Sequence, residues 1–279
     1  MIGWTAWRDV PATERLANEQ ALEHLAEDGF VVTSRELSRD GPWRIEIFGE
    51  GERPTLHGHW TWEELPDKDW VTENQRSFQP FRVGPFWVHP SHNAEGIPTG
   101  ALPLRIDAGM AFGTGTHATT RGCLEMLASL DPNETRNSVD VGCGSGILAI
   151  AMAKLWQRPV LGGDNDAQAV EVAIENAALN GVANFCRFFT SIGLSTPDLA
   201  APAPYDLIVA NILAGPLVDL AEPFAKATKA GGRVLLSGLL LEQADMVLAA
   251  YSGQGFTLAR HIDLETGGAQ WRTLLLRKG

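Results

Sequence analysis

The sequence predicts an α/β fold: a small α+β domain followed by a doubly wound, mostly parallel sheet of seven strands that ends in an antiparallel hairpin. The length of 279 residues lies near the ~250 to 300 residues at which a chain divides into domains. From about residue 118 onward, apolar strands alternate with helices, as in a parallel sheet that is covered on both faces. Only the turn E-T-G-G at 265–268 separates the last two strands, which are therefore expected to pair antiparallel.

The chain is expected to contain three parts: an α+β domain at 1–62, a linker at 63–100 and the α/β domain at 101–279. The linker holds five prolines and three glycines between short apolar runs, so only a few short strands are expected in it. In the first part, Pro11 precedes a helical pattern and Gly29 follows it. The elements predicted there are a helix at 12–27 and strands at 2–8, 29–36 and 43–49.

The third part is expected to supply all seven strands of the large sheet. They lie near 137–141, 159–164, 185–189, 205–210, 232–237, 255–263 and 270–276. Helices are predicted between them, near 118–130, 147–157, 166–180, 214–229 and 241–253. In such folds ligands bind at the carboxyl edge of the parallel strands, so residues at that edge are the first candidates for a site.

The net charge of −12 is concentrated near the N-terminal end, where residues 1–75 hold sixteen Asp or Glu and seven Lys or Arg. An acidic surface repels phosphate backbones and attracts basic proteins. Direct nucleic-acid binding is therefore disfavoured and a basic protein partner is favoured, with a charge that only keeps the domain soluble as the open alternative. Seven of the nine tryptophans lie in residues 1–87, and some are expected to mark a contact face.

Cysteine content and hydropathy narrow the class of protein further. The three cysteines, Cys123, Cys143 and Cys186, form no C-x-x-C pair, so neither a disulfide framework nor a zinc site is indicated and no metal is assigned. No stretch reaches the ~18 apolar residues of a membrane span, and the first residues lack the pattern of a secretory leader. A cytoplasmic monomer without membrane contact is expected.

A glycine-rich turn, V-D-V-G-C-G-S-G at 139–146, follows the first strand of the α/β domain. Gly142, Gly144 and Gly146 permit positive φ and the close approach of a ligand, and the helix that begins near Ile147 directs free N–H groups toward it. The spacing G-x-G-x-G differs from the dinucleotide pattern G-x-G-x-x-G, which makes NAD and FAD weaker candidates. No G-K-[ST] follows a glycine loop, so a P-loop is excluded.

Asp164 ends the next strand, twenty-two residues after Gly142. This is close to the offset of ~20 residues at which a carboxylate accepts both hydroxyls of a ribose. Asp166 is the alternative, but it directly precedes a helix and is suited to be its N-cap. The turn and the carboxylate together predict an adenosine site.

Four segments resemble the PrmA family of class I methyltransferases. They are D-V-G-C-G-S-G-I-L-A-I-A at 140–151, A-G-M-A-F-G-T-G-T-H-A-T-T at 108–120, N-I-L at 211–213 and L-L-S-G-L-L at 235–240. The resemblance runs through 100–279 and, more loosely, into the linker. It implies a Rossmann-like class I methyltransferase domain that uses S-adenosyl-L-methionine. It also implies methylation of lysine ε-amino and/or N-terminal α-amino groups of a basic ribosomal protein, the eleventh of the large subunit, which the small front domain would bind.

The resemblance also implies the residues of the donor site. Family residues that hold the donor match Thr120, Gly142, Asp164 and Asn211, and a loop that begins at Phe112 would cover the methionine end and exclude water. The complete set predicted to bind the cofactor is Phe112, Gly113, Thr114, Thr120, Gly142, Gly144, Asp164 and Asn211. One departure is visible: Ala118 replaces the proline usual in the family, which is expected to loosen the loop without removing a ligand contact.

Asn211 is the predicted catalytic residue, because its side-chain carbonyl, at the end of an apolar strand, could accept a hydrogen bond from the donor or the incoming amine. Its alternative role is to cap the following helix. Methyl transfer from a sulfonium mainly requires a positioned, desolvated and unprotonated amine, so no strong base is required. His117 is either a loop contact or a helix cap, and Cys143 is read as inert. The sequence N-I-L-A stands where many amino-methylating enzymes have N-P-P-Y, so the acceptor cage is expected elsewhere.

Three functions are compared. The first is methylation of the ribosomal protein. The second is methylation of another protein, such as an electron-transfer flavoprotein subunit, or of a small molecule; the F-G-T-G-T-H segment and the acidic front domain argue against it. The third is a binding module for adenosylmethionine without turnover, and the presence of both Asp164 and Asn211 beside the glycine turn argues against it.

Overall fold

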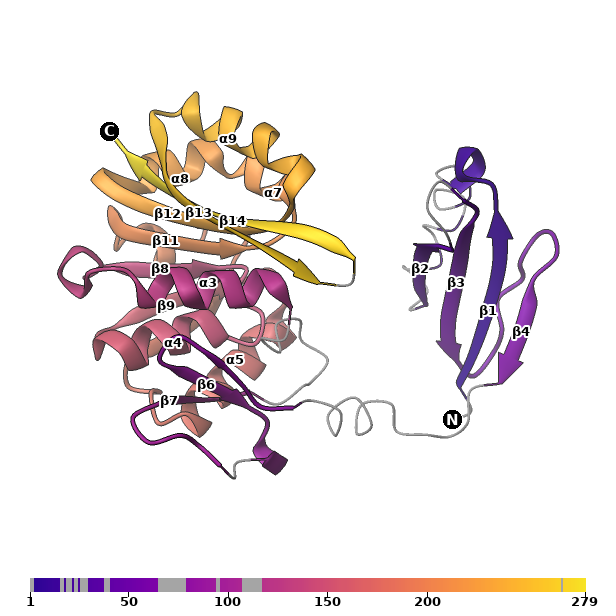
Figure 1. Ribbon diagram of the computed structural model, residues 1–279, viewed down its shortest axis with the longest axis horizontal. Helices are drawn as coiled ribbons and strands as arrows, with labels where there is room; N and C mark the ends of the chain where they lie inside the picture. Colours follow the sequence, from indigo (N-terminus) through magenta and orange to yellow (C-terminus); the bar gives the residue numbers. More distant parts are fainter. Residues whose placement is uncertain are drawn as a thin grey trace. The chain divides into compact units, whose positions relative to one another are not determined.

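The protein, seen here in a computed structural model, divides into two compact units, Met1–Glu73 and Asn74–Gly279 (Figure 1). The division falls within the expected linker at 63–100. The structure describes residues 3–15, 18, 22, 25, 30–37, 41–64, 79–93, 96–106, 117–266 and 268–279.

The first unit contains a four-stranded antiparallel sheet in the order β2-β3-β1-β4. Its strands are β1 (Gly3–Val10), β2 (Val31–Glu36), β3 (Trp43–Glu50) and β4 (Thr61–Glu64). The three strands expected here are confirmed, and β4 is an addition. Side chains alternate between the two faces of a strand, and accordingly Ile45 and Ile47 of β3 are both buried. Most of the helix expected at 12–27 lies outside the described residues, but Leu22 and Leu25 from this stretch are buried in the same core.

Arginine side chains stack on the tryptophans of the first unit. The four stacks are Arg8 on Trp60 at 4.7 Å from the ring centroid, Arg15 on Trp43 at 4.3 Å, Arg44 on Trp7 at 5.7 Å and Arg53 on Trp62 at 5.2 Å. All four distances lie within the ~6 Å over which a cation is attracted to a ring face. Much of the indole surface that was expected to meet a partner is therefore used inside this unit.

The second unit contains the predicted seven-stranded sheet, in the order β10-β9-β8-β11-β12-β14-β13. Its strands are β8 (Ser138–Val141), β9 (Val160–Asp164), β10 (Cys186–Thr190), β11 (Tyr205–Asn211), β12 (Thr228–Leu240), β13 (Phe256–Thr266) and β14 (Ala269–Lys278). The first five pair parallel, whereas β14 pairs antiparallel with both β12 and β13. The strand order reverses between β8 and β11, and a ligand crevice is expected at the carboxyl ends of strands at such a point.

Helices cover both faces of this sheet and create two cores. They are α3 (Ala118–Ala128), α4 (Ile147–Trp156), α5 (Ala167–Leu179), α6 (Pro197–Ala200), α7 (Ala214–Asp219), α8 (Ala221–Ala227) and α9 (Ala244–Ser252). In β11, Leu207 and Val209 share a core with α3, α4 and α5, whereas Ile208 and Ala210 share one with α7, α8 and α9 (Figure 1). Both faces of β11 are therefore buried, as its uninterrupted apolar sequence predicts.

The helix expected at 214–229 is two shorter helices, α7 and α8, followed directly by β12. Pro223 in α8 has no N–H to donate to the carbonyl of Asp219, one turn earlier. A proline in this position interrupts a continuous helix, which explains the break at Leu220. Of the helices in the described ranges, none is both long and apolar enough to cross a membrane.

The second unit also contains a three-stranded sheet, which precedes α3. It consists of β5 (Phe81–Val83), β6 (Phe86–His89) and β7 (Leu102–Arg105). Phe86 and Leu104 are fully buried in the same core as α3 and α4. The side chain of Asn180 accepts from the N–H of Arg105 at 2.9 Å and donates to its carbonyl oxygen at 2.7 Å. The later half of the expected linker thus packs with the helices on one face of the large sheet.

Helix α3 packs on β14 through Gly122. A Cβ on Gly122 would lie within 3.0 Å of the Thr273 hydroxyl oxygen and 3.2 Å from the Thr273 Cβ. Thr273 is buried, and its hydroxyl lies 2.9 Å from that of Ser237. We expect Gly122→Ala to lower the free energy of unfolding by roughly 1 to 3 kcal/mol, because an added carbon forces the neighbouring backbone to shift. Urea unfolding measures this change.

The matched control is Gly215→Ala in α7, where an added Cβ meets no atom within 4 Å. This substitution is expected to raise the free energy of unfolding by up to about 1 kcal/mol, because alanine restricts the unfolded chain more than glycine does. Equal effects of the two substitutions would contradict the close packing of α3 on β14.

Candidate functional site

The glycine turn between β8 and α4 is packed too closely for side chains. Gly142, Gly144 and Gly146 have φ angles of 70°, 51° and 77°, in the region that favours glycine. A Cβ on Gly142 would lie within 3.0 Å of the Ile212 side chain. On the other side, the N–H of Gly142 donates to the carbonyl oxygen of Gly163 at 2.8 Å. The turn is therefore held between the end of β9 and the residue after β11.

Asp164 connects this turn to the helix that follows β9. Its Oδ2 accepts from the N–H of Gly144 at 2.8 Å, and its Oδ1 accepts from the N–H of Asp166 at 3.1 Å. Each carboxylate oxygen has two lone pairs, so both remain able to accept a further hydrogen bond. Asp166 instead caps α5, because its Oδ1 accepts from the N–H of Gln168 at 2.8 Å. The capping role predicted for Asp166 is confirmed.

Asn211 ends β11 beside the first turn of α3. Its Nδ2 donates to the Thr120 hydroxyl at 3.3 Å, whereas its Oδ1 is buried and accepts no hydrogen bond from the described residues. A buried polar atom without a partner costs about 1 to 3 kcal/mol, so this oxygen indicates a partner that a ligand supplies. The N-cap of α7 is Leu213, which excludes the alternative that Asn211 caps this helix.

His117 is the N-cap of α3, where its ring Nδ1 accepts from the N–H of Thr119 at 3.4 Å. Its ring meets that of Trp271 edge-on, with 4.5 Å between the ring centroids. Burial lowers the pKa of His117, because desolvation penalises the charged imidazolium. We therefore interpret His117 as a neutral imidazole that caps α3.

A cavity of about 610 Å³ opens at the carboxyl edge of the sheet, within the ~300 to 1,000 Å³ range of small-molecule sites. It brings together five residues of the predicted cofactor set, Thr120, Gly142, Gly144, Asp164 and Asn211. The other three, Phe112, Gly113 and Thr114, lie outside the described residues. The remaining lining residues are His117, Thr119, Cys143, Ile147, Leu148, Asn165, Ile212, Leu213, Gly238 and Trp271.

Trp271 lines this cavity but does not belong to the predicted set. It lies near the start of β14, where it pairs with Leu240 at the end of β12. Because β14 runs antiparallel, its first residues lie at the carboxyl edge of the parallel strands. The sequence does hold a signal for this position, because the predicted hairpin makes the last strand run antiparallel to the strands before it. The indole N–H of Trp271 is buried and has no partner among the described residues. Its ring gives the cavity an aromatic side chain, which the segment N-I-L-A does not supply.

Asp140 lies just before the turn and is buried. Its Oδ2 accepts from the N–H of Ala149 at 3.1 Å, and its Oδ1 accepts from no group in the described ranges. Burial raises the pKa of Asp140 to about 7; the bond from Ala149 opposes this rise and the charge of Asp164 adds to it. Burial also raises the pKa of the Cys143 thiol, which therefore stays protonated and unreactive. In the described part of the chain, no group of three His, Cys, Asp or Glu is placed to hold a metal ion.

The ionisation of Asp140 predicts a pH dependence of stability. Its pKa is about 7 in the folded protein and 3.8 in the ordinary, solvated state, so the folded protein holds this proton more tightly. As the pH rises from about 4 to about 7, the unfolding free energy of the wild type should therefore fall relative to Asp140→Asn, by at most about 4 kcal/mol. Urea unfolding of both proteins across this pH range tests it. Parallel pH profiles would contradict a carboxyl that is protonated by burial.

Comparison with known proteins identifies the family of this chain. The family model described as ribosomal protein L11 methyltransferase (PrmA) matches residues 44–278. A ribosomal protein L11 methyltransferase of Brucella abortus (strain S19) is 42% identical over 262 residues, covering 89% of this chain and 91% of that protein. One of Bradyrhizobium diazoefficiens is 41% identical over 240 residues, covering 86% and 80%. The crystal structure of ribosomal protein L11 methylase from Lactobacillus delbrueckii subsp. bulgaricus shares 30% identity and a TM-score of 0.61, covering 72% of this chain and 100% of that chain. The chain therefore belongs to the ribosomal protein L11 methyltransferase (PrmA) family.

Proposed function

We propose that this protein transfers methyl groups from S-adenosyl-L-methionine to ribosomal protein L11, on lysine ε-amino and/or N-terminal α-amino groups. The matching relatives are named ribosomal protein L11 methyltransferase, and the matching solved structure is named ribosomal protein L11 methylase. The observation in this chain that carries the proposal is the cavity at the carboxyl edge. Asp164 and Asn211 both line this cavity, and the Asn211 Oδ1 has no hydrogen-bond partner among the described residues.

The residues of the cavity fit the methyl donor. Asp164 would accept the ribose hydroxyls, because both of its oxygens retain lone pairs. Gly142 and Gly144 would lie against the bound molecule, since both line the cavity and have the positive φ angles that favour glycine. Thr120 and Asn211 would bind nearer the methionine end, where the ligand would give the orphaned Asn211 oxygen a partner. The family resemblance alone supports Phe112, Gly113 and Thr114 as the loop over the donor.

The chain's own residues would prepare the acceptor amine. When bound, S-adenosyl-L-methionine supplies a methyl group on a positively charged sulfur, whose departure needs no protonation. Ile212, Leu213 and Trp271 line the cavity together with Asn211 and contribute apolar surface to it. Removing a lysine amine from water lowers its pKa and favours the neutral, nucleophilic form. The Asn211 Oδ1 would accept an N–H of that amine and orient its lone pair.

His117 is not required as a general base in this scheme. Its Nδ1 already faces the N–H and hydroxyl of Thr119, at 3.4 and 2.9 Å. Its depressed pKa supports a neutral ring that caps α3 and packs on Trp271. The proton of the amine would instead leave to water or to a nearby carbonyl.

The charge of the chain supports a basic protein as the acceptor. The excess of acidic residues in 1–75 favours long-range attraction of a basic partner and disfavours direct nucleic-acid binding. We place the enzyme in the cytoplasm, since the three cysteines are unpaired thiols, as a reducing compartment favours. We propose a monomer, because the described residues of a single chain line the donor cavity.

Substitution of the two neighbouring aspartates separates donor binding from helix capping. Asp164→Ala is expected to weaken S-adenosyl-L-methionine binding by about 1 to 3 kcal/mol, because it removes hydrogen bonds to a charged acceptor. Titration calorimetry measures the affinity. Asp166→Ala is the matched control: it should lower the free energy of unfolding by about 1 kcal/mol through loss of the α5 cap, with donor affinity retained. Equal donor affinity in Asp164→Ala and wild type would place the ribose contact elsewhere.

Methyl transfer to a panel of purified ribosomal proteins tests the proposed acceptor. With labelled S-adenosyl-L-methionine, we expect label in L11 and none in other ribosomal proteins of similar size and charge. Mass spectrometry of the product locates the methylated amino groups. Labelling of a different protein, or of none, would overturn the proposal.

The same assay assigns the role of the first unit. A chain that lacks residues 1–75 should retain donor affinity, because every lining residue of the donor cavity lies in the second unit. It should lose methylation of L11, since it lacks the acidic unit proposed to hold that protein. Full methylation by the truncated chain would remove the docking role from the first unit.

A further inference from the structure

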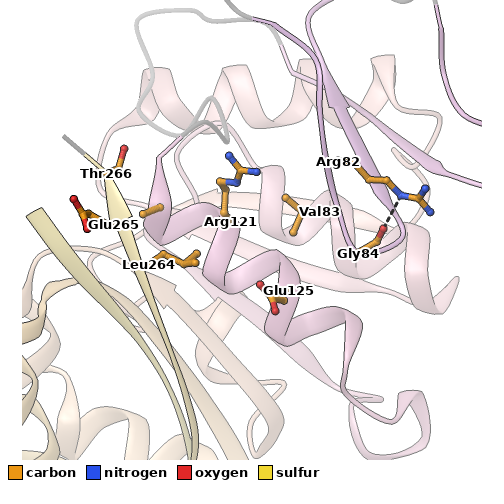
Figure 2. A pocket seen from close by; sticks show the side chains of 9 residues that line it. Arg82, Val83, Gly84, Arg121, Glu125, Leu264, Glu265 and Thr266 are labelled. Carbon is orange, nitrogen blue, oxygen red and sulfur yellow. Dashed lines mark hydrogen bonds between the residues drawn. The ribbon is translucent and has the colours of Figure 1, made fainter. Parts of the chain in front are cut away.

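A second cavity, of about 480 Å³, lies beside α3 in the second unit (Figure 2). Three elements form it: the hairpin of β5 and β6, one face of α3 and the end of β13. Its charged lining residues are Arg82, Arg121, Glu125 and Glu265, and Val83 and Leu264 contribute apolar surface between them. Figure 2 shows Arg121 and Glu125 on α3 between Arg82 on one side and the strand that carries Leu264 and Glu265 on the other.

The first turn of α3 separates this cavity from the donor cavity. Thr119 and Thr120 line the donor cavity, whereas Ala118 and Arg121 line the second one. The hairpin of β13 and β14 likewise contributes residues to both cavities. Leu264, which lines the second cavity, is the register partner of Trp271, which lines the donor cavity. A polypeptide whose amine enters beside Trp271 therefore has its neighbouring residues within reach of the second cavity.

The charged groups of the second cavity make no ion pairs among the described residues. The guanidinium of Arg121 stacks at 4.7 Å from the ring centroid of Phe81, and the Nε of Arg82 donates to the carbonyl oxygen of Gly84 at 3.1 Å. The carboxylates of Glu125 and Glu265 accept no hydrogen bond from the described residues. On the same hairpin, by contrast, Arg272 and Asp263 form a two-point ion pair. Two carboxylates thus border a hollow while the arginines beside them are held by other groups.

We propose that the second cavity is an acceptor subsite that holds a lysine or arginine side chain of L11 close to the amine being methylated. This inference rests on the proposed function, which supplies a basic polypeptide at the donor cavity. Val83 and Leu264 fit the aliphatic stem of such a side chain, and Glu125 and Glu265 accept its charged head. The guanidinium nitrogens of Arg82 and Arg121 donate to backbone carbonyl oxygens of the same segment.

The test is steady-state methylation of L11 by the double variant Glu125→Gln/Glu265→Gln. We expect the KM for L11 to rise roughly ten-fold, as for the loss of two exposed ion pairs, with kcat and the donor Kd unchanged. The control is Glu171→Gln/Glu175→Gln on α5, which removes two exposed carboxylates and the same total charge. It should leave the KM within about two-fold of wild type, because screening weakens charges that lie away from the contact.

A further pair of variants tests the sign of the charge that the subsite accepts. Arg121→Gln should raise the KM for L11 less than the double glutamate variant does. Its control is Arg187→Gln, because the guanidinium of Arg187 also stacks on a phenylalanine, at 5.3 Å from the ring centroid of Phe189. A larger effect of Arg121→Gln would overturn the proposal in favour of an acidic side chain. Equal KM values for the two double variants would overturn the subsite while the proposed function stands. If the wild type does not methylate L11, both the subsite and the proposed function are contradicted.

Discussion

The carboxyl edge of the large sheet depends on the fit of Ile212 between two glycines. A Cβ on Gly142 would lie within 3.0 Å of the Ile212 side chain, and one on Gly238 would lie within 3.0 Å of the Ile212 backbone. The N–H of Ile212 also donates to the carbonyl oxygen of Ser237 at 3.1 Å. These contacts bring the ends of β8, β11 and β12 together and fix Asn211 beside α3. A side chain at either glycine would separate the strands whose ends form the donor cavity.

Several polar atoms at this edge are buried without a hydrogen-bond partner among the residues that the structure describes. They are the Oδ1 of Asn211, the indole N–H of Trp271 and, below the turn, the Oδ1 of Asp140. Native proteins leave few such atoms, because each one lowers stability. Asn211 and Trp271 both line the donor cavity, so their unused hydrogen-bonding capacity lies where a ligand would bind. Local stability is reduced where binding requires it, as is usual for functional sites.

Strong periodic patterns predicted the large sheet and much of its edge. The glycine turn and Asp164 could be found because one strand, one turn and one helix fix their separation along the chain. Other features lacked such a local signal. The runs of β5 and β6 are too short to show a period, so their packing on the second unit was not evident. The break between α7 and α8, by contrast, does have a local signal in Pro223, which the helix predicted at 214–229 ignored. Trp271 reaches the cavity only through the pairing of β14 with β12, a contact between distant segments.

The place of β14 in the sheet has a consequence for how the protein is made. This strand lies between β12 and β13, although it follows both of them along the chain. A ribosome releases the strands in chain order, so the sheet has a vacant position until the last strand emerges from the exit tunnel. Trp271 arrives with that strand. The wall of the donor cavity therefore stays incomplete until β14 has left the tunnel and paired with β12 and β13.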